Sequence, residues 1–174
     1  MDPGRRIGNP VRVTAIDVRP AVASDAAFIR RTLEASWGAT MVAVHGELID
    51  AATQSVLIAR DAEHRRVGLL TYRAEPSDVA WEIVSLDATT PGVGVGTALI
   101  SALRSQARQS GVQRLWLVTT NDNTDALRFY QRRGFDLAAL HRDAVTVARR
   151  LKPAIPQLSN GIPLRHELVL DMRP

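Results

Sequence analysis

The chain has no cysteine among its 174 residues. Disulfides, a thiolate nucleophile and cysteine-ligated zinc or iron–sulfur sites are therefore excluded. The four histidines (His45, His64, His141 and His166) show neither an HExxH motif nor paired spacing, so we expect no metal site. Aromatic residues make up only 5% of the chain. That scarcity argues against an RNA- or ribosome-associated module, which would interleave aromatic side chains with Lys and Arg.

Long hydrophobic runs are also missing. No apolar stretch approaches the ~20 residues that a membrane-spanning helix requires, so we expect no membrane partner. The first ten residues contain Arg5 and Arg6 but no apolar segment behind them, which does not fit a secretory signal. We expect a flexible leader over residues 1–10, a single domain over residues 11–174, and a cytoplasmic protein.

Charge is only mildly unbalanced. Lys and Arg number 22 and Asp and Glu number 18, which gives a formal net charge of +4. The arginines are scattered rather than gathered into one stripe, so nucleic acid is not the expected partner. A mild positive field instead suits a small phosphorylated polyanion.

Hydrophobic periodicity predicts one α/β (α+β) domain with a mixed sheet. The first helix lies between Ser24, the predicted N-cap, and Gly38; its apolar face includes Trp37, which favours a core position. Residues 39–54 are ambiguous: MVAVHG fits a short strand, and ELIDAATQ fits a turn or a loose helix. Strands are predicted over 11–19, 55–61, 66–74, 79–88, 113–120, 135–141 and 164–172, and further helices over 95–109, 123–133 and 142–151.

Three glycines in five residues (Gly92, Gly94 and Gly96) separate a predicted strand from a predicted helix. Glycine permits positive φ and removes the side chain that would block a close approach. Exposed N–H groups in such a turn, together with the helix N-terminus, bind anions such as phosphate; a plain tight turn is the alternative. A Rossmann fingerprint would need glycine where Thr97 or Leu99 stands, and a P-loop would need a nearby Gly-Lys-Ser/Thr, so neither motif fits.

Two motifs resemble the GNAT superfamily of N-acetyltransferases. Residues 91–100 (PGVGVGTALI) are similar to the family's acyl-CoA loop, approximately Arg/Gln-x-x-Gly-x-Gly/Ala. Residues 121–135 (NDNTDALRFYQRRGF) are similar to its Asn-x-x-Ala-x-x-x-Tyr-x-x-x-Gly-Phe signature, and the order of elements agrees over about residues 11–141. The resemblance implies the GNAT fold: a mixed, mostly antiparallel sheet of about seven strands, with splayed fourth and fifth strands and helices on both faces.

The resemblance also implies that the chain binds acetyl-CoA and needs no metal. The pantetheine arm would pair with the edge of the fourth strand, the loop would hold the pyrophosphate, and Arg132 or Arg133 would meet the 3′-phosphate; a solvated helix end is the alternative for both arginines. Pro91 departs from the family's Arg/Gln and has no N–H to donate, so one phosphate contact is expected to be missing. The implied cofactor residues are Leu86, Asp87, Ala88, Gly92, Val93, Gly94, Val95, Gly96, Thr97, Asn123 and Arg133.

Catalytic roles are implied for two residues. Glu82 stands where many family members carry the general base; a simple exposed strand carboxylate is the alternative. Tyr130 matches the tyrosine that serves the departing thiolate; a tyrosine packed on the sheet is the alternative. The implied reaction transfers an acetyl group to a primary amine within a ternary complex. A non-catalytic acyl-CoA-binding or sensing domain on the same fold is the rival.

The acceptor is expected to be a small molecule or a peptide with a free amine, and a homodimer is possible. Its pocket should come from residues 36–50 and from residues 142–163, which separate the last two strands. Trp37, His45 and Glu47 are the side chains to follow there, with a base as one interpretation of His45 and a satisfied surface histidine as the default. Prolines in the 142–163 insertion favour an ordered segment, which predicts a lid over the acceptor site.

Overall fold

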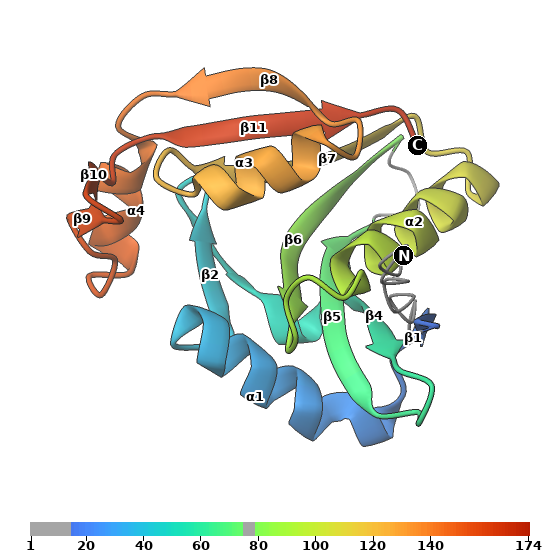
Figure 1. Cartoon of the computed structure of the whole chain (residues 1–174). Coiled ribbons are helices and arrows are strands. Elements are labelled where there is room, and N and C mark those ends of the chain that lie inside the picture. The colour runs from blue at the N-terminus through green and yellow to red at the C-terminus, as the bar shows by residue number, and fades with distance from the viewer. Residues whose placement is uncertain (1–14, 75–78) are drawn as a thin grey trace, which may run out of the picture.

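The structure is a computed structural model that describes residues 15–74 and 79–174. The predicted leader and the start of the strand predicted over 11–19 lie outside these residues. Seven strands form one mixed sheet: β1 (Asp17–Pro20), β4 (Ser55–Arg60), β5 (Arg66–Arg73), β6 (Ala80–Ala88), β7 (Arg114–Thr120), β8 (Asp136–His141) and β11 (Glu167–Met172). Their order is β1-β4-β5-β6-β7-β11-β8 (Figure 1). The β6–β7 pair is parallel and the other neighbouring pairs are antiparallel, which confirms the predicted GNAT-type sheet.

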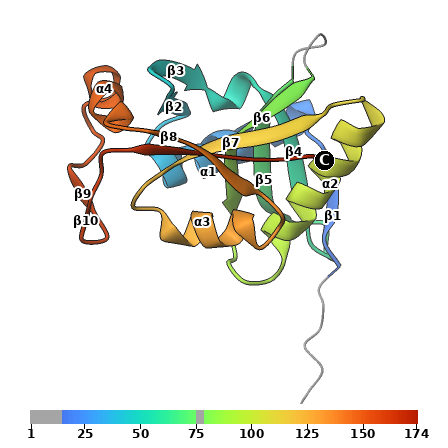
Figure 2. The same ribbon diagram turned by 90° about the horizontal axis from the view of Figure 1, so that it is seen from above.

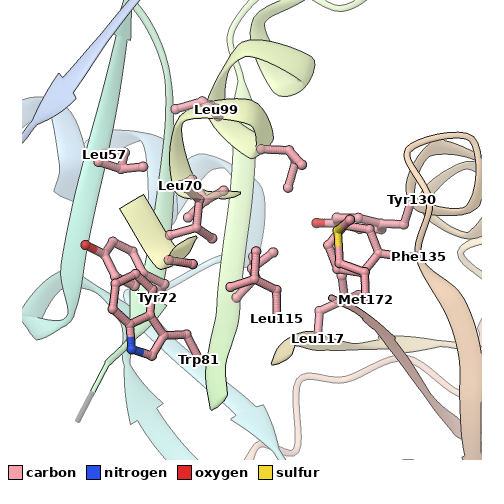
Figure 3. Packing of buried hydrophobic residues seen from close by; sticks show 14 of the residues in the cluster. Leu57, Leu70, Tyr72, Trp81, Leu99, Leu115, Leu117, Tyr130, Phe135 and Met172 are labelled. Carbon is pink, nitrogen blue, oxygen red and sulfur yellow. The ribbon is translucent and has the colours of Figure 1, made fainter. Parts of the chain in front are cut away.

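Helices cover both faces of the sheet, as Figure 2 shows from above. Successive residues of a strand point to opposite faces. In β4, Leu57 belongs to the core cluster that also holds residues of α2 (Val95–Gln109) and α3 (Thr124–Gln131), whereas Ile58 belongs to the cluster that holds residues of α1 (Ala26–Trp37). The larger core, drawn in Figure 3, joins the α2–α3 face to the middle of the sheet. Within the described residues, no helix is both long enough and apolar enough to cross a membrane.

The start of α1 differs from the prediction. Ser24 is not the N-cap: a 3₁₀ turn over Ala23–Asp25 precedes the helix. The Asp25 carboxylate is fully buried, accepts a hydrogen bond from the Val22 amide at 2.8 Å, and is ion-paired with Arg19 and Arg66. Because burying a carboxylate is costly unless it is paired and hydrogen-bonded, this network decides where the helix begins.

Residues 41–50 form a β-hairpin, and a 3₁₀ turn over Ala51–Thr53 follows it, so the turn or loose helix predicted for ELIDAATQ is wrong for its first half and confirmed for its second. The hairpin consists of β2 (Met41–Val44) and β3 (Glu47–Asp50), and Val44 pairs with Glu47. Its two-residue loop has positive φ at both His45 (54°) and Gly46 (74°), as a type I′ turn requires. Asn-Gly and Asp-Gly are the usual signals for this turn, and the rarer His-Gly pair concealed it.

The 142–163 insertion is ordered, as predicted. It contains α4 (Ala144–Leu151) and a short hairpin of β9 (Leu158–Ser159) and β10 (Ile162–Pro163). The buried face of α4 consists of Val145 and Ala148, whereas Val147 and Leu151 are exposed. Lys152 ties the insertion to the first half of the chain, since its ammonium donates to the carbonyl oxygens of Trp37 (2.8 Å) and Met41 (2.9 Å).

Candidate functional site

Strands β6 and β7 run side by side and then part. Their pairing extends from Ala80 opposite Arg114 to Ile83 opposite Leu117. At that point Val84 is an extra residue between the pairs that β6 makes with β5, and such a bulge bends a strand. The rest of β6, residues 84–88, has no partner on the β7 side. A cavity of about 320 Å³, here called the strand-gap cavity, lies between β6, β7 and α3.

The glycine turn stands at the head of α2. Gly92 and Gly94 have φ of 81° and 91°, and Gly94 is the N-cap of the helix. The first intrahelical bond runs from the Ala98 amide to the Gly94 carbonyl. The preceding amides, from residues 95–97, therefore have no intrahelical acceptor. They point along the helix axis, and this arrangement, here called the anion cradle, has the geometry that suits a bound phosphate.

Two further glycines hold this turn in place by close packing. A Cβ on Gly96 would lie 2.8 Å from the Phe129 ring, so glycine lets α2 approach α3. A Cβ on Gly68 of β5 would lie 2.5 Å from the Val95 side chain and 2.7 Å from the Asp87 carbonyl oxygen. Gly68 could not be recognised from the sequence, because a single glycine inside a strand indicates only that another group comes close to the backbone.

Arg133 extends from the end of α3 to the same turn. Its guanidinium lies 3.5 Å above the Phe129 ring and donates to Thr97 Oγ1 and to the Phe129 carbonyl. Burial lowers the pKa of Arg133. An open cavity of about 480 Å³ lies beside it, lined also by Arg128 and Arg132. Three arginines and Thr97 of the α2 N-terminus thus line one hollow, together with the carboxylate of Asp125.

Asn123 and Tyr130 border the strand-gap cavity from α3. Asn123 is the N-cap of that helix, and its side chain accepts from the Ala126 amide at 3.1 Å. Tyr130 is buried and packs edge-to-face on Phe135 (Figure 3) and on Phe129. Burial, and then the charge of Asp87, raise the pKa of the Tyr130 hydroxyl well above its usual value. The phenol therefore stays protonated and can donate.

Glu82 is buried, not an exposed strand carboxylate; only 5% of the residue is accessible. Its Oε1 lies 3.3 Å from His45 Nε2, and its Oε2 lies 3.4 Å from a guanidinium nitrogen of Arg73. The hydrogen bond to Glu82 raises the pKa of His45 in spite of partial burial. The His45 ring packs 5.1 Å from Trp116, and the residue remains exposed with Glu82 as its partner, in line with the default of a satisfied surface histidine.

Three adjoining cavities make up the candidate site. The strand-gap cavity meets a chamber of about 100 Å³ that Glu82 lines, here called the Glu82 chamber. The chamber meets a third cavity of about 370 Å³ beneath α4, here called the α4 cavity. Trp37 lines all three and is 40% exposed, so its predicted core position was wrong. Glu47 is largely exposed and pairs with Arg73 at 3.8 Å; it lines none of the three cavities.

The His45–Glu82 pair predicts a pH-dependent stability. The pKa of folded His45 lies above the ordinary 6.5, so the ionic attraction is fully present below pH ~6.5 and is lost as pH rises through the folded value. His45→Asn keeps a residue that tolerates positive φ but removes the charge. At pH 6 we expect the variant to be less stable than the parent by about 1 kcal/mol. At pH 9 the difference should vanish or reverse in differential scanning calorimetry. An equal deficit at both pH values would show that the pair is not ionic.

The fold and site define an α/β protein with an anion cradle at the mouth of a splayed parallel strand pair. A family model described as the acetyltransferase (GNAT) family matches residues 26–135, and the chain belongs to this family. Two relatives from Bacillus subtilis (strain 168) are both described as uncharacterized. YdhI is 37% identical over 136 residues, with 78% of this chain and 84% of YdhI covered. YxbD is 38% identical over 135 residues, with 77% and 84% covered.

Solved structures share the fold at low sequence identity. A GCN5-related N-acetyltransferase from Kribbella flavida gives a TM-score of 0.70 at 19% identity, with 92% of this chain and 98% of that chain covered. A GNAT family acetyltransferase from Elizabethkingia anophelis with acetyl-CoA bound gives 0.64 at 16%, with 91% and 98% covered. These matches agree with the observed sheet and helices.

Proposed function

We propose that the protein transfers an acetyl group from acetyl-CoA to a primary amine by direct attack within a ternary complex. The observation that carries the proposal is the row of cavities. It runs from the anion cradle at the glycine turn, along the open edge of β6, to a buried carboxylate. An acyl donor and an amine acceptor could thus enter from opposite ends and meet beside Glu82.

The residues present fit acetyl-CoA. The free amides of Val95, Gly96 and Thr97 suit a pyrophosphate, and backbone groups of residues 86–88 are left open on the β7 side to pair with an extended arm. Asn123 borders that gap, and Arg133 or Arg132 suits the 3′-phosphate. Pro91 supplies no amide, so fewer donors are available than the family pattern would give. The related structure from Elizabethkingia anophelis contains acetyl-CoA, which supports this assignment.

Acetyl-CoA supplies the activated acetyl group as a thioester. Glu82 accepts the proton that the attacking amine must lose, and His45, 27% exposed in its side chain, passes that proton toward solvent. We assign the backbone N–H of Leu86 to the carbonyl oxygen, where such a donor is typically worth about 10²–10³ in rate. The Tyr130 hydroxyl, kept protonated by burial, donates to the departing sulfur.

The acceptor side is proposed to be the α4 cavity, which is lined by residues from the 36–50 region and from the insertion. The Lys152 contacts hold α4 against the Trp37 loop, so the insertion would act as a fixed lid. Its proposed task is acceptor recognition, because it lies beyond Glu82 as seen from the glycine turn and lines neither the strand-gap cavity nor the hollow beside Arg133.

Thermal unfolding with added ligands tests the proposal. Acetyl-CoA at 100 times its Kd should add about 2.7 kcal/mol of stability, whereas NAD, ATP and GTP should add little, because the turn fails both the Rossmann and the P-loop spacing. Stabilisation by ATP with none by acetyl-CoA would overturn the assignment. Stabilisation by acetyl-CoA without transfer to any amine would instead favour a sensing domain.

A further inference from the structure

A second buried carboxylate faces the acceptor side, and the reaction proposed above does not use it. Glu167, the first residue of β11, is 3% exposed and borders both the Glu82 chamber and the α4 cavity. It pairs across the sheet with Thr120. Across residues 15–74 and 79–174, its side chain makes no hydrogen bond or ion pair. A buried carboxylate is costly without a cationic or hydrogen-bonding partner, so a ligand is the natural source of one.

The nearest lysine and the His45 imidazole are already engaged, and His141, which lies opposite Glu167 across the β8–β11 pair, makes no ion pair with it within the described residues. Lys152 borders the α4 cavity, but its ammonium donates to two backbone carbonyls. His45 makes its ion pair with Glu82. Glu82 and Glu167 therefore present two carboxylates to one small chamber. His45 and Arg73 make ion pairs only with Glu82, although the charge of Glu167, after the hydrogen bond and the charge of Glu82, also raises the pKa of His45.

The α4 cavity itself is mostly apolar. Its walls include Val42, Val145, Ala148, Ile155 and Leu164. A volume of about 370 Å³ lies near the lower end for small-molecule pockets. A peptide acceptor would bring amide groups that need hydrogen-bond partners, and these walls offer few. The cavity suits a compact apolar body attached to the group that enters the chamber.

We propose that the acceptor is a small primary amine with an apolar body and no carboxylate beside the amine, and that Glu167 binds its ammonium group. The inference rests on the proposed acetyl transfer and names its substrate class. The ammonium enters the chamber between Glu167 and Glu82, and the apolar body fills the α4 cavity. Glu82 then takes the proton, while Glu167 acts as a specificity residue. An α-carboxylate would face two like charges, which disfavours amino acids.

Phenethylamine and phenylalanine are a matched pair of probes, because they differ only in the carboxylate. We expect kcat/KM for phenethylamine to exceed that for phenylalanine by about 100-fold or more. Isothermal titration of phenethylamine into the protein–CoA complex measures binding apart from chemistry. It should show saturable binding, with none for 2-phenylethanol, which lacks the cation.

Glu167→Gln keeps the shape of the side chain and removes its charge. It should weaken phenethylamine binding and raise KM by about 10–100-fold, with kcat within about threefold of the parent. Glu63→Gln changes a largely exposed carboxylate in the β4–β5 turn and should change neither phenethylamine binding nor KM.

Ala154 is exposed and borders the α4 cavity. Ala154→Trp should therefore weaken phenethylamine binding about tenfold and leave ethylamine binding unchanged.

The outcomes distinguish a failure of this inference from a failure of the proposed acetyl transfer. Unchanged phenethylamine affinity in Glu167→Gln, or equal use of phenylalanine, would overturn the inference while acetyl transfer stands. If Glu167→Gln does not fold, equal losses of phenethylamine and ethylamine in Ala154→Trp would overturn it. If the protein binds phenethylamine in preference to phenylalanine but acetylates neither, the proposed class of ligand would be supported and the proposed acetyl transfer would be contradicted.

Discussion

Glu82→Gln is expected to lower kcat/KM at pH 7 by about 10²–10⁴-fold, the usual contribution of one positioned base. Glutamine keeps the size and hydrogen bonding of the side chain but cannot accept the amine proton. The loss should shrink at high pH, where free amine accumulates. The measurement is the rate of CoA thiol release against pH for parent and variant, with Glu63→Gln as the control carboxylate.

Tyr130→Phe serves as the contrasting variant. Because burial keeps the Tyr130 hydroxyl protonated, its removal should lower the rate by a similar factor at every pH. Both variants should bind acetyl-CoA nearly as well as the parent, since backbone amides would hold the phosphates. A Glu82→Gln enzyme with an unchanged rate at pH 7 would remove Glu82 from the mechanism.

Gly94→Val is expected to abolish the stabilisation that acetyl-CoA gives. Gly94 has φ of 91° and opens the helix whose first amides form the cradle. Valine disfavours that backbone and adds a branched side chain where the phosphates would approach. Thermal unfolding with and without acetyl-CoA measures the effect.

Gly111 provides the matched control for that substitution. It also has positive φ (74°) and open space around its Cα, but it lies beyond the other end of α2. Gly111→Val should therefore carry a comparable backbone cost and keep the response to acetyl-CoA. If the two variants respond alike, the glycine turn has no special part in binding.

The regular elements were predictable because their signals are local. Alternating and continuous apolar runs located the strands of the sheet, and the two motifs identified the glycine turn, Asn123 and Tyr130. The splay of β6 and β7 came only through the family resemblance. Its physical cause, the extra residue Val84 in the pairing with β5, has no signature in the sequence.

The acceptor side was the least predictable part, since distant contacts determine it. Trp37 lies on the apolar stripe of α1, yet it stands between three cavities and not in the core. His45 meets Glu82 only because a left-handed turn aims its ring there. Glu167, in a predicted strand, gave no sign that it would be buried beside a cavity. The positions of such side chains depend on tertiary packing, which hydrophobic periodicity and secondary-structure propensity do not describe.

The most direct test of the central claim is CoA thiol release on mixing the protein with acetyl-CoA and a panel of primary amines, with mass spectrometry of the amine. Release that depends on the amine, yields the N-acetylated product and falls by about 10²–10⁴-fold in Glu82→Gln is the predicted result. Release that is the same with and without amine, or an acetylated amine at an unchanged rate in Glu82→Gln, would contradict it.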